Sequence, residues 1–140
     1  SWIPYAASKA WTLLAGDGVK TVNVWFRDKF DNDTPALTFY SATITLDTTK
    51  PTNGTVLIEG GVEFTNNPNV TLTLSATDTG SGVDSMRFSK DKITWLPWGA
   101  YTTSSSYTLS SAKGKKTVYV QFRDKAGNVS PVYSDSITLQ

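Results

Sequence analysis

Carboxylates and hydroxyls are the side chains through which this sequence could do chemistry. The chain has 140 residues, 12 of them acidic, and it contains neither histidine nor cysteine. It therefore lacks the commonest general base, thiol nucleophiles and most zinc ligand sets. Serine and threonine are plentiful, but no histidine can activate them and no G-x-S-x-G stretch is present. Oxygen ligands for a hard cation remain as the chemistry that the composition offers.

Three aspartates, Asp47, Asp78 and Asp124, stand at the ends of strand-like apolar patterns. In a seven-strand up-and-down sandwich, the last strand of one module leads through a linker to the pole of the next module where its second and sixth strands end. Asp47 would lie at the former, and Asp78 and Asp124 at the latter. With backbone carbonyls and Asn128 nearby, they would form an oxygen-rich group that could bind Ca²⁺ and stiffen the joint between modules. The favoured interpretation is that each aspartate caps its own turn.

Other aspartates allow two further interpretations. Asp84 and Asp91 also lie near loops and could contribute to a catalytic carboxylate pair, but aspartates beside Gly, Thr and Asn are ordinary turn residues. Asp135 shares a buried register with Ile137 and could join a lysine in an intramolecular isopeptide link. Ala42 holds the matching place in the first repeat, so a bulge or a polar sheet edge is the favoured explanation. We therefore expect no catalytic residue and no enzymatic activity.

Aromatic side chains divide into an inward and an outward group. The residues expected in the core include the two tryptophans that stand in matched places just before a proline, so that the predicted core contains Trp2, Trp95, Val120 and Phe122. Trp25 lies out of phase with the buried register of its strand and should point outward, as Tyr119 does in the second repeat. An outward ring could stack on a sugar or rest on cross-strand neighbours. A planar row of exposed rings would favour the sugar.

An internal repeat organises the chain. The stretch KKTVYVQFRDKAGN at residues 115–128 nearly repeats VKTVNVWFRDKFDN at residues 19–32, and the match extends until residues 1–47 repeat residues 94–140. Asp, Gly and Asn in the second copy predict a tight turn after Asp124, whereas Phe30-Asp31 in the first copy predicts a wider one. Residues 48–54 contain Pro51 and several turn formers, which indicates a short, stiff linker.

Short alternating apolar patterns predict an all-β chain. The strands expected in residues 55–140 number seven and cover 55–58, 70–76, 85–89, 93–98, 106–109, the stretch from 117, and 133–139. Glycine and proline punctuate the gaps, and no segment keeps a helical period. This spacing predicts an antiparallel two-sheet β-sandwich, with a small closed barrel as the main competitor. Residues 55–140 would form one complete seven-strand module, preceded by the last four strands of another in residues 1–47.

Several motifs in sequence order resemble a known family. The DTTKP linker, the NG of the opening strand, the FTNNPNVTLTLSATDTGSGVDSMRFSKDKITWLPW stretch and the closing VYVQFRDKAGNVSPVYSDSITL are similar to bacterial immunoglobulin-like repeats, which are strung in tandem in large secreted and cell-surface proteins. The resemblance covers the whole second module and the C-terminal half of another. It implies an immunoglobulin-like fold, an extracellular or bacterial cell-surface location, and neighbouring immunoglobulin-like modules as partners.

Charge and hydropathy limit the other classes of function. Thirteen basic and 12 acidic residues give a formal charge of +1. A net charge this small does not favour binding to nucleic acid or to an anionic membrane. No apolar run reaches the length of a membrane span. We expect a structural or adhesive spacer module of a multidomain bacterial surface or secreted protein, with no cofactor other than Ca²⁺. The alternative is a carbohydrate-binding accessory module of a secreted enzyme, in which Trp25 and Tyr119 would contact the ligand.

The first half-module lacks a cover for its apolar face. Ser1 does not begin a signal peptide, so we expect the sequence to be a piece of a longer protein. Leaving half a dozen large apolar side chains in water forfeits on the order of 10 kcal/mol. We therefore expect completion by an identical half-unit in a homo-oligomer, or by a separate segment of the parent protein. The uncovered residues are Trp2, Trp11, Val22, Val24, Phe26 and Ile44.

Overall fold

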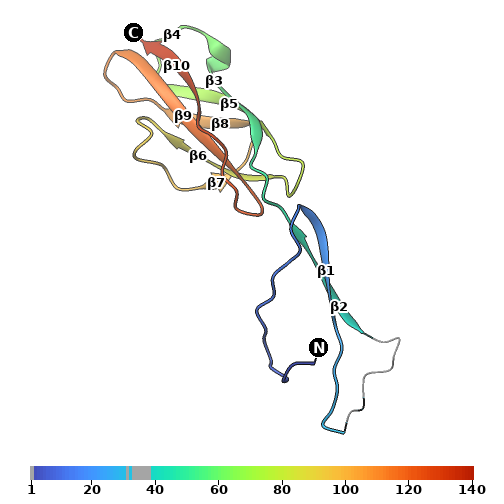
Figure 1. Ribbon diagram of the computed structural model, residues 1–140. Coiled ribbons are helices and arrows are strands. Elements are labelled where there is room, and N and C mark those ends of the chain that lie inside the picture. Colours follow the sequence, from blue (N-terminus) through green and yellow to red (C-terminus); the bar gives the residue numbers. More distant parts are fainter. Residues whose placement is uncertain (1, 31, 33–38) are drawn as a thin grey trace. The chain divides into compact units, whose positions relative to one another are not determined.

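The chain divides into two compact units, Ser1–Asp47 and Thr48–Gln140 (Figure 1). The computed structural model describes residues 2–30, 32 and 39–140. Strands make up most of the regular structure, and the described part of the chain has one short helical turn, η1 (Glu59–Gly61). The fold that positions the candidate site belongs to the second unit.

The second unit consists of two sheets. One sheet has five strands in the order β4 (Phe64–Thr65), β10 (Tyr133–Leu139), β9 (Gly114–Asp124), β6 (Val83–Ser89) and β7 (Gly99–Ala100). The other has three strands in the order β3 (Thr52–Ile58), β5 (Asn69–Thr77) and β8 (Ser104–Thr108). All neighbouring strands are antiparallel except β4 and β10, which are parallel. The predicted all-β, immunoglobulin-like antiparallel sandwich is therefore confirmed.

The core lies between the two sheets and follows the period of two in each strand. Leu72 and Leu74 of β5 face Val118, Val120 and Phe122 of β9, and each of the five is at most 2% exposed. Intervening residues of β5 are exposed. The remaining buried apolar residues of this core are Val56, Ile58, Val70, Met86, Leu109 and Ile137.

The second unit has eight strands where the sequence analysis predicted seven, and the largest differences concern three segments. The strand expected at residues 93–98 is wrong, because side chains take up the amides of Ile93 and Thr94, although the amide of Leu96 donates to the carbonyl of Phe88. Ser89 Oγ accepts hydrogen bonds from the amides of Asp91 and Lys92, and Asp91 Oδ1 accepts from those of Ile93 and Thr94, at 2.8–3.2 Å. This turn leaves one isolated bridge to Trp95, and β7 follows it. The short strand β4 was not predicted, and β3 begins at Thr52, inside the expected linker.

The first unit contains a two-stranded antiparallel sheet made of β1 (Gly18–Val24) and β2 (Tyr40–Leu46). The expectation of four strands in residues 1–47 is not met, because residues 2–17 form no strand. Two strands that would correspond to β7 and β8 are missing. In the second unit β7 pairs with β6, and β8 pairs with β5, so each of these edge strands depends on a partner that has no counterpart among the described residues of the first unit.

The two tryptophans expected in the core lie elsewhere. Trp95 is half-buried on the outer face of the five-stranded sheet, where the guanidinium carbon of Arg87 lies 4.8 Å from its ring centroid. Trp2 is 46% exposed and stacks with Arg27 at 4.6 Å. The prediction failed because a ring that stacks on a guanidinium is shielded from water without entering the core. Val120 and Phe122 are fully buried.

Candidate metal centre

Asp124 closes β9 and continues the inward register of that strand. Its two predecessors in this register, Val120 and Phe122, are core residues, and Asp124 itself is 2% exposed. Its Oδ1 accepts a hydrogen bond from the amide of Asn128 at 2.8 Å, and its Oδ2 accepts one from Asn128 Nδ2 at 2.9 Å. The turn that follows β9 therefore holds a carboxylate at the rim of the core.

Asp78 follows β5 directly and begins the loop to β6. Its Oδ1 accepts a hydrogen bond from the amide of Gly82 at 2.8 Å. Its Oδ2 is buried and accepts no hydrogen bond from any described residue. A buried carboxylate oxygen without a donor is costly, because burial removes its water and nothing replaces it. This oxygen is therefore available to accept a donor or to ligate a cation.

Asp47 follows β2 and immediately precedes Thr48. Its side chain is 6% exposed. Asp47, Asp78 and Asp124 each offer one carboxylate oxygen within 4.8 Å of the other two. These are the three aspartates that the sequence analysis selected, and the unpartnered oxygen of Asp78 is a further feature that no sequence pattern could show.

This spacing suits a calcium ion. Two oxygens on opposite sides of Ca²⁺ are roughly 4.6–5.2 Å apart, because each Ca–O bond is about 2.3–2.6 Å. Three ionised carboxylates so close together repel one another by about 3 kcal/mol per pair at an effective dielectric constant of ~20. A divalent cation would reverse the sign of this interaction. The three side chains could supply three of the six to eight oxygens that Ca²⁺ takes, and carbonyls and water would supply the rest.

The first repeat contains the same turn without the metal-site geometry. Asp28 Oδ1 accepts from the amide of Asn32 at 3.0 Å and Oδ2 accepts from Asn32 Nδ2 at 2.8 Å, as Asp124 does with Asn128. In both repeats the Asp amide also donates to the Asn carbonyl at 3.1 Å. The bonds between Asp28 and Asn32 therefore match those between Asp124 and Asn128, whereas Asp31, on which the expectation of a wider turn rests, lies outside the described residues. Asp28 is exposed, and the side-chain hydrogen bond from Asn32, followed by backbone amides, lowers its pKa.

The residues considered for sugar binding do not form a flat platform. Trp25 is 48% exposed and its ring lies 5.6 Å from that of Phe39 with an interplanar angle of 54°. Tyr119 is half-buried, and Lys92 Nζ lies 4.8 Å from its ring centroid. The guanidinium carbons of Arg87 and Arg123 each lie 4.5 Å from the ring centroid of Trp98. Cations occupy faces of the rings on the second unit, so those faces are not free for a sugar.

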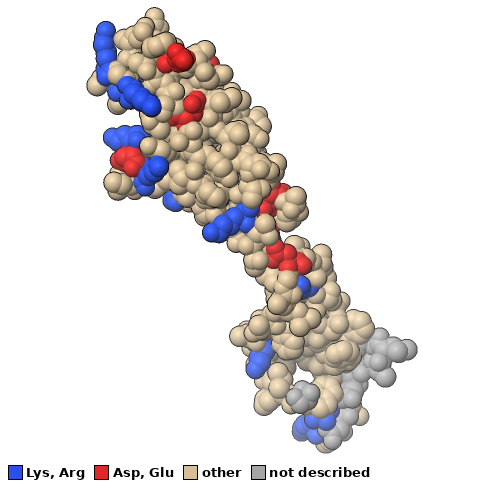
Figure 2. All heavy atoms as spheres, turned by 45° about the horizontal axis from the view of Figure 1, so that its top comes forward, with Lys and Arg blue, Asp and Glu red and all other residues tan. Residues whose placement is uncertain are grey.

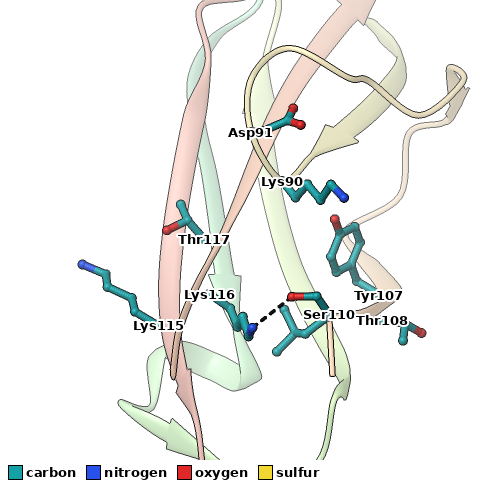
Figure 3. A pocket seen from close by; sticks show the side chains of 9 residues that line it. Lys90, Asp91, Tyr107, Thr108, Ser110, Lys115, Lys116 and Thr117 are labelled. Atoms are coloured by element: carbon teal, nitrogen blue, oxygen red, sulfur yellow. Dashed lines mark hydrogen bonds between the residues drawn. The ribbon is translucent and has the colours of Figure 1, made fainter. Parts of the chain in front are cut away.

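A shallow polar groove of about 280 Å³ runs along the edge of the sandwich beside β8 and β9 (Figure 3). Lys116 Nζ donates a hydrogen bond to Ser110 Oγ at 2.9 Å in this groove. The sequence analysis missed this pair, which only the fold brings together. Because Lys116 donates to an exposed hydroxyl, it does not act here as the base that would activate a nucleophile. Burial, with the nearby charge of Asp91, raises the pKa of Tyr107 in the same groove.

Asp135 has a structural role in the described chain. Its Oδ2 accepts a hydrogen bond from the amide of Ile58 at 2.8 Å, and its Oδ1 accepts from the amide of Ser136 at 2.8 Å. Both carboxylate oxygens are therefore engaged with backbone amides. This favours the polar sheet-edge interpretation over an isopeptide link.

The fold places the second unit in the class of immunoglobulin-like β-sandwich modules. The chain is similar to the solved fibronectin(III)-like modules of Clostridium thermocellum CbhA, with 14% identity and a TM-score of 0.53, over 90% of this chain and 64% of that one. It also aligns with the PKD1 domain of Vibrio anguillarum Epp, with 12% identity and a TM-score of 0.48, over 67% of this chain and 98% of that domain. The first of these likenesses supports the fold. No family model matches the chain, and no curated protein sequence matches it.

The charged side chains of the second unit do not gather into a patch of one sign on the face that Figure 2 draws. Basic and acidic side chains are interspersed on the face of the second unit drawn in Figure 2, where most of the surface is uncharged. Among the described residues no helix is long and apolar enough to cross a membrane.

Proposed function

We propose that the chain is a non-enzymatic structural or adhesive spacer from a multidomain bacterial surface or secreted protein. We further propose that Asp47, Asp78 and Asp124 bind Ca²⁺, and that the bound ion restrains the linker that starts at Thr48. The observation that carries this proposal is the convergence of the three carboxylates, one of which precedes the linker, within 4.8 Å. Sequential repeats of one strand pattern support the spacer role. The likeness in fold to other bacterial modules agrees with it but does not specify a function.

The role of the cation follows from where the three aspartates lie in the sequence. Asp47 ends the first repeat, whereas in the second unit Asp78 directly follows β5 and Asp124 ends β9. A cation shared among them would reduce the freedom of the intervening chain, which starts at Thr48. Its Pro51 is already buried. Without the cation the linker would keep the conformational restraint that proline provides, but it would lose the restraint from the shared attraction of the three carboxylates to the ion.

Calcium titration by isothermal calorimetry tests the site, together with melting curves recorded in Ca²⁺ and in chelator. The informative variant is Asp78→Asn, because it removes charge from the unpartnered oxygen while an amide oxygen can still accept from Gly82. The matched control is Asp84→Asn, since Asp84 is exposed and outside the cluster. At 100 times the Kd, Ca²⁺ should stabilise the native protein by about 2.7 kcal/mol.

We expect heat of binding and a calcium-dependent rise in Tm in the native chain and in Asp84→Asn, and a loss of both in Asp78→Asn. Absence of heat, with identical melting in Ca²⁺ and chelator, would leave the aspartates as turn caps only. If Asp78→Asn and Asp84→Asn showed the same heat of binding and the same calcium-dependent change in Tm, calcium would bind at a site other than this cluster.

Glycan binding is the alternative function, and the geometry favours it less. The tilted pair of Trp25 and Phe39 does not offer the planar row of rings that a sugar-binding face requires. A glycan array gives the direct test. Submillimolar binding that disappears in Trp25→Ala or Tyr119→Ala would replace the spacer proposal with an accessory carbohydrate-binding module.

A further inference from the structure

The hairpin of the first unit repeats a hairpin of the second unit pair by pair. β1 and β2 are in register from Gly18 opposite Leu46 to Val24 opposite Tyr40. β9 and β10 are in register from Gly114 opposite Leu139 to Val120 opposite Tyr133. The sequence repeat aligns each pair of the first hairpin with one of the second, so equivalent side chains lie on equivalent faces.

These equivalent side chains have opposite environments. Val24 is 39%, Phe26 44% and Ile44 58% exposed, whereas their counterparts Val120, Phe122 and Ile137 are at most 1% exposed. The β1–β2 apolar face, as we name it, comprises Val22, Val24, Phe26, Ile44 and Leu46. Val22 and Leu46 of this face are half-buried, and the other three side chains are exposed. Neighbouring exposed large apolar side chains mark an interaction surface.

The second unit shows what kind of segment covers such a face. There the matching residues pack against Val56 and Ile58 of β3, Leu72 and Leu74 of β5, and Met86 of β6. Two of these strands also hold the edge strands of the sheets, because β5 pairs with β8 and β6 pairs with β7. Residues 2–17 carry the sequence counterparts of β7 and β8 and form no strand. One missing segment therefore accounts both for the exposed face and for the absent strands.

We propose that the β1–β2 apolar face docks a segment with the strand pattern of residues 52–89, carried by another part of the same protein, and that docking completes the first unit as a second sandwich. The chain's own β3, β5 and β6 cannot do this, because they already cover β9 and β10. A second copy of the hairpin is disfavoured, since it would bring no counterpart of β5 or β6 for residues 2–17 to pair with. The proposal is independent of the metal site.

The chain supplies its own probe for this surface. Five residues of the β1–β2 apolar face have identical counterparts in the second unit, namely Val118, Val120, Phe122, Ile137 and Leu139. A second copy of residues 48–93, joined through a flexible linker ahead of the full chain, should therefore fit the face. One contact will be missing, because Ala42 stands where Asp135 binds the amide of Ile58.

The test compares amide hydrogen exchange in the full chain and in this extended chain. We expect exchange at β1 and at residues 11–13 to slow by about 100-fold in the extended chain, because local opening becomes coupled to a packed core. The matched control has the same extension with Leu72→Asp and Leu74→Asp in the added copy only. Protected amides of β9 report that the original second unit is folded in every sample.

Equal exchange at β1 in the extended chain and its control would overturn the proposal. Light scattering on the unextended chain independently measures whether the chain is a monomer or a dimer. A monomer of 15.2 kDa is expected, and a dimer with slow exchange at β1 would assign the face to a second copy instead.

A single substitution keeps the proposal testable if the extended chain precipitates. Phe26→Ser should lower the binding of a hydrophobic dye to the unextended chain, whereas Val19→Ser should not, because Val19 is 70% exposed on the opposite face of the hairpin. Equal dye binding by the two variants would mean that the β1–β2 apolar face is not an accessible docking surface, and would overturn the proposal.

Discussion

Asp135 on β10 accepts a hydrogen bond at 2.8 Å from the backbone amide of Ile58 on β3, and so joins the two sheets of the sandwich. Ile58 is fully buried. An amide that loses its acceptor in such a place is not rescued by bulk water. The aspartate at position 135 is thus explained by the hydrogen-bond acceptor that it supplies to β3, and not by packing within its own strand.

We expect Asp135→Ala to lower the free energy of unfolding by about 1–3 kcal/mol, because it leaves the Ile58 amide without a partner. Asp135→Asn should cost less, since the amide oxygen can still accept. Urea denaturation measures the difference, with Asp84→Ala as the exposed control. A loss in Asp135→Ala no greater than that of the control would show that the cross-sheet bond adds nothing.

Gly54 is predicted to be intolerant of a methyl group. A Cβ at this position would overlap the ring of Tyr133, which packs against Phe122 at a centroid distance of 6.2 Å. We expect Gly54→Ala to destabilise the second unit by about 1–3 kcal/mol through this overpacking. Gly99→Ala is the matched control, because no atom lies within 4 Å of its added Cβ. Denaturation midpoints of the two variants should differ, and in a Tyr133→Ala background the cost at Gly54 should disappear.

The hairpins could be predicted, and the three aspartates could be selected as candidates, because their signals are local or repeated. Alternation assigns an inward face to β9, and the second copy of the pattern fixes the same assignment for β1. Asp78 and Asp124 stand at strand ends, so their positions follow once the strands are known. A sandwich then places those ends at one pole.

The failures came from contacts between residues distant in sequence or from side chains that replace backbone partners. Nothing near Trp95 in the sequence shows that Arg87 will lie over its ring. The turn at Ser89 and Asp91 binds four backbone amides, and two of these, those of Ile93 and Thr94, lie in the segment that the apolar pattern assigned to a strand. Phe64–Thr65 is too short to give a periodic signal, and it becomes β4 because β10 lies beside it.

Two turn aspartates should titrate at low pH. Hydrogen bonds from the amides of Thr94 and then Ile93 are the largest causes that lower the pKa of Asp91. For Asp28 the largest cause is the side chain of Asn32. A folded-state pKa below the unfolded value of about 3.9 means that the contribution to stability is present above that pH and is lost as pH falls through the folded pKa.

Carboxylate carbon NMR titration provides the measurement for this pair. Thr94→Pro removes a donor and should raise the pKa of Asp91 while leaving that of Asp28 unchanged. Asn32→Ala should do the reverse. Each variant is the control for the other, and a common shift of both carboxyls would attribute the lowered pKa values to general charge and not to these turns.

Arg87 is expected to hold the outer face of the five-stranded sheet together as a planar group and not only as a charge. Its guanidinium carbon lies 4.8 Å from the ring of Trp95 and 4.5 Å from that of Trp98, and its Nε and a terminal nitrogen donate to Gln121 Oε1 at 3.1 and 2.7 Å. A lysine would keep the positive charge, but its ammonium group cannot stack flat on the two rings or donate through a planar pair of N–H groups. We therefore expect Arg87→Lys to cost about 1–2 kcal/mol in urea denaturation.

The variant should also change the near-ultraviolet circular dichroism of the tryptophans, because their rings lose a rigid neighbour. A double-mutant cycle of Arg87→Lys with Trp98→Leu isolates the stacking from the bonds to Gln121. Lys90→Met serves as a control that removes an exposed charge on the same segment. If Arg87→Lys were as stable as Lys90→Met and the cycle showed no coupling, the stacked geometry would be a consequence of the fold and not a source of its stability.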